Sequence, residues 1–173
     1  AGTLEVYQGI DRLLEAFAIV VRQMPDAGLL IVGGSSREVQ GFRAMADTLG
    51  LDESVLFTGR LPQPEAQRLV RLAGAAVSPR FAGNNTPMKI YQLMADGIPL
   101  VATRIESHTQ VLNDDIAVLA TPDADGLARA IIEVLADPRS AQAMGERAKA
   151  WYQEKYSREV YTQKMRTMLS LVS

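Results

Sequence analysis

The fold is decided by the stretch from Ser78 to Pro99, which reads SPRFAGNNTPMKIYQLMADGIP. An apolar segment, residues 75–77, comes directly before it. Proline is frequent in the first turn of a helix, and a Gly-x-Pro sequence ends a helix. The stretch therefore predicts the end of a strand, a polar loop and a helix over residues 87–96. A helix start leaves backbone N–H groups unpaired and carries partial positive charge. With the cations Arg80 and Lys89 nearby, this pattern favours a phosphate site.

Apolar runs alternate with amphipathic helical periods through the first 136 residues. Nearly continuous apolarity is typical of strands covered on both faces, as in a parallel sheet. The predicted strands are residues 28–32, 54–58, 75–78, 99–103 and 116–120. The predicted helices are residues 10–24, 37–49, 64–73, 87–96 and 127–136, and then, with no strand between them, 140–154 and 157–171. The alternation predicts an α/β fold with a doubly wound parallel sheet that ends in two consecutive C-terminal helices.

The composition excludes several classes of protein. The 173 residues are enough for one domain with a sizeable core. With 18 basic and 20 acidic residues the net charge is −2. Such a charge produces no strong positive electrostatic field that would attract nucleic acid or a membrane surface nonspecifically. The absence of cysteine and the single histidine exclude a disulfide framework and a Cys- or His-rich metal site. We therefore expect neither a metal nor another cofactor.

The sequence contains no recognisable targeting signal. No run approaches the roughly 20 apolar residues that a membrane span needs, and no signal peptide is found. These observations predict a cytoplasmic protein without a membrane span. The sequence begins at Ala1 rather than at a methionine, so we expect it to be part of a longer protein.

The stretch from Ser78 to Pro99 resembles the donor site of the retaining nucleotide-sugar glycosyltransferases of the family 4 type, the group 1 glycosyl transferases. In that family a Glu-x7-Glu pattern leads into Ala-Met-Ala-x-Gly-x-Pro, and residues 92–99 lie in this register. The similarity is greatest to members that read Gly-Thr-Asn-Thr-Pro-Leu-Lys-Ile-Tyr-Gln here and Ser/Thr-His-Thr-Gln-Val-Leu further on, as residues 107–112 do. The resemblance implies a Rossmann-like domain, the C-terminal half of the two-domain GT-B fold.

Four positions depart from the family pattern. Asn84 and Gln92 stand where the motif has its two glutamates. Thr3 and Gln8 stand where the family has the arginine and lysine that clamp the donor diphosphate. The resemblance therefore implies a diphosphate site whose positive charge comes from other residues.

Three cations remain as candidates for binding the diphosphate. Lys89 can act as a point charge, and Arg80 and Arg60 can offer a planar fork. Arg60 follows a predicted strand, where open α/β sheets bind their ligands. Structural explanations stay open beside these roles: Lys89 would fit a solvated helix flank, and Arg80 would fit a buried ion pair.

Polar groups and glycines complete the candidate nucleotide-sugar site. Besides the three cations, it is predicted to contain Thr3, Gly34, Gly83, Asn84, Asn85, Thr86 and Gln92. One residue before Pro87 is expected to cap the helix, as Asn and Thr often do. Gln92 would bond ribose hydroxyls, and Gly34 lies in a Gly-Gly-Ser-Ser loop that a tight turn alone would also explain. We assign no catalytic residue, and we expect His108 to be a capping or surface histidine rather than a general base.

The resemblance also bears on domain organisation and partners. In the family the last helix packs on the other domain, which implies a nucleotide-sugar-binding domain over 1–155 and a crossing helix over 156–173. The apolar positions of that helix would then be partly exposed or packed locally: Val160, Met165, Met168 and Leu169. The family also has a central strand before Gly2, and either the chain tolerates its absence or another chain fills the gap. The expected partners are a nucleotide sugar, an N-terminal acceptor domain and, through the absent strand or the last helix, a second copy.

The leading hypothesis is the donor-binding domain of a glycosyltransferase that moves a sugar from a nucleoside-diphosphate sugar to an acceptor with retention, inactive on its own. The alternative is a non-catalytic nucleotide- or protein-binding module on a degenerate half of the fold. Loss of the motif glutamates and of the clamp cations favours the alternative, and the retained block Asn85-Thr86-Pro87-Met88-Lys89 and Gln92 oppose it. A sugar-nucleotide epimerase would need acidic and histidine groups that the motifs do not supply.

Overall fold

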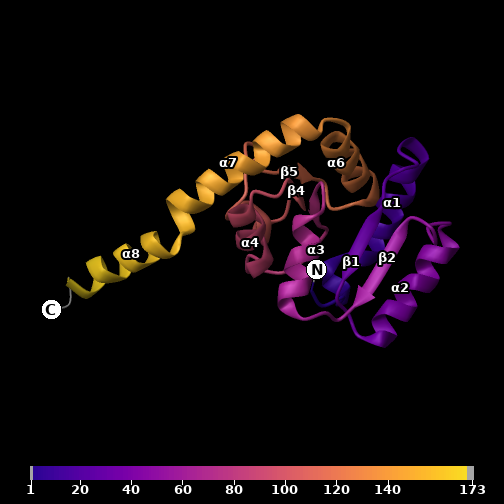
Figure 1. Ribbon diagram of the computed structural model, residues 1–173, viewed down its shortest axis with the longest axis horizontal. Coiled ribbons are helices and arrows are strands. Elements are labelled where there is room, and N and C mark those ends of the chain that lie inside the picture. The colour runs from indigo at the N-terminus through magenta and orange to yellow at the C-terminus, as the bar shows by residue number, and fades with distance from the viewer. Residues whose placement is uncertain (1, 171–173) are drawn as a thin grey trace.

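The computed structural model describes residues 2–170, which form an α/β domain followed by a helical extension (Figure 1). Every strand pair is parallel. β1 (Leu29–Val32) pairs with β2 (Val55–Gly59), while β4 (Leu100–Thr103) lies between β3 (Ala76–Ser78) and β5 (Val118–Ala120). The predicted α/β architecture with parallel strands is confirmed. The strands are, however, hydrogen bonded in two separate sheets rather than in one.

The N-terminal segment joins the first sheet at the carboxyl end of β1. The Gly2 N–H donates to Val32 O at 2.9 Å, and Gly2 forms a parallel bridge with Gly33. Gly33 in turn bridges Gly59 at the end of β2. A side chain at Gly33 would overlap the Gly2 backbone, and its φ of 117° is disfavoured for other residues, so glycine is required there.

Helices flank the strands as the apolar periods predict. Their bounds are η1 (Val6–Gln8), α1 (Ile10–Gln23), α2 (Ser36–Thr48), α3 (Gln63–Arg71), α4 (Met88–Asp96), α5 (Glu106–Thr109), α6 (Ala124–Ala136), α7 (Pro138–Tyr156) and α8 (Arg158–Ser170). The differences from the prediction lie mainly at helix ends. α6, for example, begins three residues early at Ala124, because the Asp123 side chain accepts the Gly126 N–H and caps the helix.

The core consists of two apolar clusters. One cluster joins α1 to α6 and to strands β1 and β2, and it includes Leu14, Phe17 and Leu127. The other cluster joins α4 to α7 around β4 and includes Ile90 and Leu100. These clusters place the carboxyl ends of the strands and the start of α4 on a rigid base.

The C-terminal extension begins where α7 ends. Ser157 is extended, with ψ of 159°, and interrupts the helix before α8. Figure 1 shows α8, in yellow, projecting away from the body of the domain. Met168 and Leu169 are 60% and 66% exposed, as expected for apolar positions that the domain does not cover. The division at residue 155 and the crossing role of 156–173 stay predictions, and residues 171–173 lie outside the described part of the chain.

Candidate functional site

The loop after β3 leads directly into α4. Pro87 was predicted to be the first residue of this helix, but it is the N-cap and the helix begins at Met88. No side chain caps this helix start. The prediction that Asn84, Asn85 or Thr86 caps the helix is therefore wrong. The Thr86 hydroxyl instead donates to Gln110 Oε1 at 3.4 Å. The first N–H groups of α4 are thus not engaged by a capping side chain.

Arg80 lies beneath this loop and is 7% exposed. Its Nη1 donates to Asn85 O at 3.0 Å, and its guanidinium carbon lies 4.8 Å from the centroid of the Tyr7 ring. Its Nε is buried without a hydrogen-bond partner. No ion pair to Arg80 is present within residues 2–170, so the buried ion pair considered from the sequence is not formed.

Lys89 follows the start of α4 by one residue and is half-buried. Its Nζ donates to Gln8 Oε1 at 3.4 Å. Burial lowers the pKa of Lys89 to about 8, and the positive charge of Arg80 acts in the same direction. Across the described chain no carboxylate pairs with Lys89 either. Arg80 and Lys89, hereafter the cation pair, therefore form a centre of positive charge that no carboxylate of residues 2–170 neutralises.

The N-terminal segment runs between the carboxyl end of β1 and the cation pair. Gly2 contacts β1, the Tyr7 ring lies against Arg80, and Gln8 accepts from Lys89. The Phe81 N–H donates to Tyr7 O at 3.2 Å. Thr3, which was predicted to contact the ligand, donates to Glu5 Oε2 at 3.2 Å. The segment therefore connects the two sheets at the edge where the predicted site residues gather.

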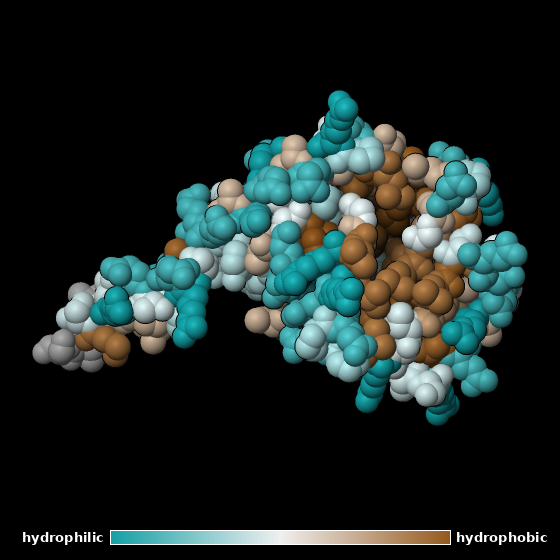
Figure 2. Space-filling model, in the orientation of Figure 1, coloured by the Kyte–Doolittle hydropathy of each residue, from teal (hydrophilic) through white to brown (hydrophobic). Residues whose placement is uncertain are grey.

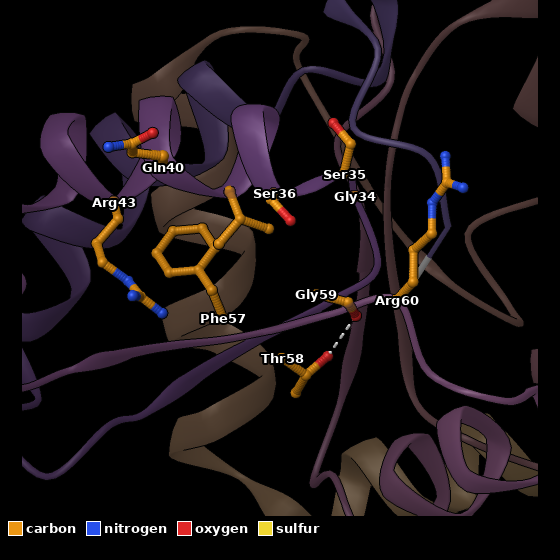
Figure 3. Close-up of a pocket in the computed structure, with 10 residues that line it drawn as sticks. Gly34, Ser35, Ser36, Gln40, Arg43, Phe57, Thr58, Gly59 and Arg60 are labelled. Carbon is orange, nitrogen blue, oxygen red and sulfur yellow. Dashed lines mark hydrogen bonds between the residues drawn. The ribbon is translucent and has the colours of Figure 1, made fainter.

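A groove with a volume of about 810 Å³ opens at the carboxyl ends of β1 and β2. We call it the α2–β2 groove; it is lined by Gly34, Ser35, Ser36, Val39, Gln40, Arg43, Phe57, Thr58, Gly59 and Arg60. Figure 3 shows Gln40 and Arg43 extending from α2 on one side of Phe57, with Arg60 on the other side. Both arginines are exposed, whereas Phe57 is only 6% exposed and belongs to the core, so the accessible lining of the groove is mainly polar and cationic.

Hydrogen bonds stabilise the α2 side of this groove. Ser35 caps α2 and forms a capping box with Glu38, in which the Ser35 N–H donates to Glu38 Oε2 at 2.7 Å. The hydrogen bonds from Ser35 hold the pKa of Glu38 below its ordinary value, and the positive charge of Arg60 contributes in the same direction. The loop is therefore held by side-chain hydrogen bonds of Ser35 and Glu38 in addition to its glycine turn.

The predicted site residues fall into three groups. Gly34 and Arg60 line the α2–β2 groove. Arg80, Gly83, Asn85 and Lys89 lie at the cation pair, where the guanidinium of Arg80 occupies the space beside Gly83. The remaining residues, Thr3, Asn84, Thr86 and Gln92, make contacts within the protein that need not involve a ligand. Gln92, for instance, is exposed and donates to Asp96 Oδ2 at 2.9 Å.

Other residues at these places were not identified from the sequence. Tyr7 covers the Arg80 guanidinium, and a single tyrosine in a loop gives no recognisable signal. Ser36, Gln40 and Arg43 all line the groove from one face of α2. Their i, i+4, i+7 spacing is a signal that could have been found, because polar residues at this spacing lie on the same face of a helix.

His108 is fully buried, so the prediction of a capping or surface histidine is wrong. Its Nδ1 lies 2.8 Å from Thr103 O, and its Nε2 lies 3.0 Å from Ser78 Oγ. Burial lowers the pKa of His108, and the positive charges of Lys89 and Arg80 add to this effect. A short helix, α5, that the sequence did not predict carries this side chain into the core between β3 and β4.

Residues 2–170 contain neither a cluster of metal-binding side chains nor a membrane-spanning helix. No group of three or more acidic, histidine or cysteine side chains is arranged to hold a metal ion. No helix in this part of the chain is both long and apolar enough to cross a membrane.

Comparison with known proteins identifies the family of residues 1–151, which match the model for "Glycosyl transferases group 1". A GDP-mannose-dependent alpha-(1-6)-phosphatidylinositol monomannoside mannosyltransferase of Mycolicibacterium smegmatis is 32% identical over 152 residues. These residues make up 83% of this chain and 40% of that relative. A phosphatidyl-myo-inositol mannosyltransferase of the same organism is 30% identical over 135 residues, with 77% and 34% covered. The chain thus spans less than half the length of the curated relatives that it matches.

Solved structures share the fold. Anabaena Alr3699/HepE in complex with UDP superposes with a TM-score of 0.85 at 21% identity, over 98% of this chain and 48% of the other. Sucrose-phosphate synthase from Thermosynechococcus elongatus gives 0.84 at 23% identity, over 99% and 44%. The C-terminal domain of a glycosyl transferase group 1 family protein (LpcC) from Francisella tularensis gives 0.80 at 16% identity, over 91% and 84%. The fold is therefore that of one half of such proteins.

Proposed function

Because this chain belongs to the group 1 glycosyl transferase family, we propose that it is the donor-binding part of a glycosyltransferase that uses a nucleoside-diphosphate sugar and retains the anomeric configuration. The acceptor would be held by another domain of the same protein. On this proposal the chain by itself binds the donor and does not turn it over.

The cation pair is the observation that carries the proposal. Two positive side chains, one buried and one half-buried, lie close enough to lower a pKa, and neither is paired with a carboxylate among the described residues. Burial of unpaired charge is unfavourable, so such a site is stabilised when an anion binds. The start of α4 adds backbone N–H groups and the positive end of the helix dipole. A diphosphate supplies the two adjacent negative charges that this arrangement accommodates.

The α2–β2 groove suits the nucleoside. It lies at the carboxyl ends of β1 and β2, and ligands of open α/β sheets bind at this edge of the strands. Val39, which is half-buried, offers an apolar contact, and Arg43 and Gln40 offer hydrogen-bond donors that can bind the edge of a base. The mannosyltransferase relative is named as GDP-mannose-dependent and the HepE structure contains UDP, so guanine and uracil are the first bases to test.

The proposed chemistry depends on charge rather than on a nucleophile. When the glycosidic bond to the diphosphate breaks, negative charge accumulates on the leaving phosphate oxygens. Arg80, Lys89 and the N–H groups at the start of α4 would stabilise that charge in place, which is the main contribution an enzyme can make to such a step. Binding of both substrates in a fixed orientation would supply the rest.

A non-catalytic binding module is the second candidate, and specific contacts favour it. Gln92 stands where the family motif has a glutamate, and its side chain bonds Asp96 instead of remaining free. Gln8 contributes no charge and already accepts from Lys89. This candidate predicts binding of a nucleotide or a protein, but no transfer even when an acceptor domain is present.

A thermal-shift screen of UDP-, GDP- and ADP-sugars tests the proposal, followed by calorimetric titration of the best ligand. A ligand that binds only the folded state raises the melting temperature in proportion to its affinity. We expect one nucleoside series to raise it, with the diphosphate more effective than the nucleoside. No shift with any of the three series would contradict the proposal. If a ligand does bind, an assay of sugar transfer or donor hydrolysis by the longer protein would distinguish an enzyme from a non-catalytic module.

A further inference from the structure

His108 is buried within hydrogen-bond reach of two strands and does not touch the α2–β2 groove. Its side chain is fully buried, as are those of Ser78 at the end of β3 and Thr103 at the end of β4. We call these three residues the His108 network. It is the buried polar cluster of the described chain that the proposed binding site leaves without a role.

The contacts determine which ring nitrogen carries the proton. The Thr103 hydroxyl donates to Arg80 O, so its oxygen can only accept from the imidazole. Nδ1 lies 3.1 Å from that oxygen and 2.8 Å from Thr103 O, which is also an acceptor. Nδ1 must therefore be protonated. In the neutral ring Nε2 then accepts from the Ser78 hydroxyl at 3.0 Å.

The network is linked to the backbone of Arg80 by one hydrogen bond, from Thr103, and by the short chain segment that follows Ser78. Ser78 lies two residues before Arg80 on the same strand end, and Thr103 bonds the Arg80 carbonyl directly. Both partners are held by the same imidazole ring. The main chain at Arg80 is therefore linked to the carboxyl end of β4 through His108.

Arg80 passes this constraint on to the loop that precedes α4. Its guanidinium donates to Asn85 O at 3.0 Å, and it fills the space that a side chain at Gly83 would need. The end of α5 adds a second link, because Gln110 donates to Asn84 O at 3.4 Å. His108 lies on α5, so both links begin at the element that it anchors.

We propose that His108 is a positioning residue: as a neutral imidazole it joins β3 to β4 and so holds Arg80 and the loop 82–86 in the geometry that binds the diphosphate. The loop geometry follows from the contacts alone, whereas the role in diphosphate binding rests on the proposed function. His108 touches no ligand in this account. It acts through Arg80.

Nuclear magnetic resonance tests the arrangement directly. The chain contains one histidine, so its ring ¹⁵N signals need no assignment among several. We expect a neutral ring at pH 7 with the proton on Nδ1. A ring protonated on Nε2 alone, or one that titrates like a free histidine, would overturn the arrangement.

Affinity measurements test the positioning role. His108→Leu removes both hydrogen bonds, whereas His108→Asn can still place a donor near the Nδ1 position. Val134→Ala is the matched control. Val134 is 4% exposed and belongs to the apolar cluster that joins α1 to α6, so its truncation lowers stability without contact to Arg80. Affinities for GDP and guanosine, or for UDP and uridine if the screen selects uracil, are measured well below each melting temperature.

The expected pattern is a selective loss of the phosphate contribution. His108→Leu should weaken diphosphate binding about tenfold and leave nucleoside binding unchanged, since small displacements of a binding group reduce its effect steeply. His108→Asn should recover part of the loss, and Val134→Ala should change neither affinity. Equal losses for nucleoside and diphosphate, or none, would overturn the positioning role.

Amide exchange keeps the loop part of the proposal testable without a ligand. The Phe81 amide at the start of the loop donates to Tyr7 O, and it should exchange faster in His108→Leu than in Val134→Ala. If the wild-type chain binds no nucleotide, the proposed function fails and the role in diphosphate binding falls with it. Equal exchange rates in the two variants would overturn the loop positioning itself.

Discussion

The two sheets of this molecule differ in how completely they are covered. Every residue of β4 is buried, whereas Leu56 in β2 is 63% exposed. Figure 2 shows apolar side chains gathered around a hollow over the region of β1 and β2. A strand with partners on both sides and helices on both faces is a rigid base, while a two-stranded parallel pair depends on whatever else packs against it.

The charged residues of the two halves follow the same division. In the β3–β4–β5 half, Arg80 is buried and held by Asn85, Tyr7 and the Thr103 hydroxyl. In the β1–β2 half, Arg43 and Arg60 are exposed, and their side chains form no hydrogen bond within residues 2–170. Preorganised charges bind a ligand at lower cost in entropy than mobile ones. We therefore expect the β3–β4–β5 half to set the geometry of the phosphate contacts. The nucleoside contacts of the β1–β2 half should be more tolerant of substitution.

The largest difference between the halves should appear in stability. Leu100→Ala in β4 removes a fully buried side chain and should lower the free energy of unfolding by about 2–5 kcal/mol. Leu56→Ala in β2 removes an exposed side chain and should change it by less than about 0.5 kcal/mol. Urea denaturation of both variants measures this. Similar losses would mean that the β1–β2 half is covered in solution, as the predicted self-association through this region would require.

Lys89 should matter more for binding than the groove arginines. Lys89→Ala should weaken nucleoside-diphosphate binding by about 1.5–3 kcal/mol, the usual contribution of a charge-assisted hydrogen bond. Lys89→Arg should restore only part of it, because a planar fork does not replace a point charge beside Arg80. Arg60→Ala, at an exposed position, should cost about 0.2–1 kcal/mol. Calorimetry at low salt measures all three, and equal dissociation constants for wild type and Lys89→Ala would refute the phosphate role of Lys89.

The pH dependence of binding should also arise at the cation pair. The pKa of Lys89 is about 8 in the free protein, and a bound anion would raise it. The complex then holds more protons than the free protein above this pH, so affinity is full below pH 8 and falls as the pH rises. Between pH 7 and pH 9 we expect a loss of about tenfold, which corresponds to about 1.4 kcal/mol.

Lys89→Met serves as the control for this pH effect, since it cannot titrate. The phosphates of the ligand are ionised throughout the range, because their last pKa is about 6. Titrations at both pH values should show the tenfold loss in the wild type and not in the variant. A loss of the same size in Lys89→Met would assign the effect to another group, such as the base.

Removal of divalent metal should have the smallest effect. The proposed positive charges are side chains and backbone N–H groups, so a nucleoside diphosphate should bind equally well with EDTA and with magnesium. Parallel calorimetric titrations measure this. Binding that requires magnesium or manganese would show that the cation pair does not compensate the diphosphate charge by itself.

Local patterns in the sequence were sufficient for most of the secondary structure, with the short elements η1 and α5 missed, and for part of the candidate site. The apolar runs at 28–32 and 99–103 became β1 and β4, and the Gly-Ile-Pro end closed α4 at Asp96. The proximity of Arg80 and Lys89 also follows from one strand–loop–helix unit. Contacts within a few residues of each other depend on backbone geometry and periodicity, and a sequence displays both directly.

What only the tertiary structure decided involves residues that are far apart in the chain. The burial of His108 depends on β3, β4 and α5 meeting, and the cover over Arg80 comes from Tyr7, which precedes it by more than 70 residues. The α2–β2 groove and the division of the strands into two sheets are likewise products of packing. The sequence by itself determined the α/β order, the parallel strands and the cationic loop before α4. Packing decided which side chains surround that loop, because burial and long-range hydrogen bonds exist only once distant segments lie together.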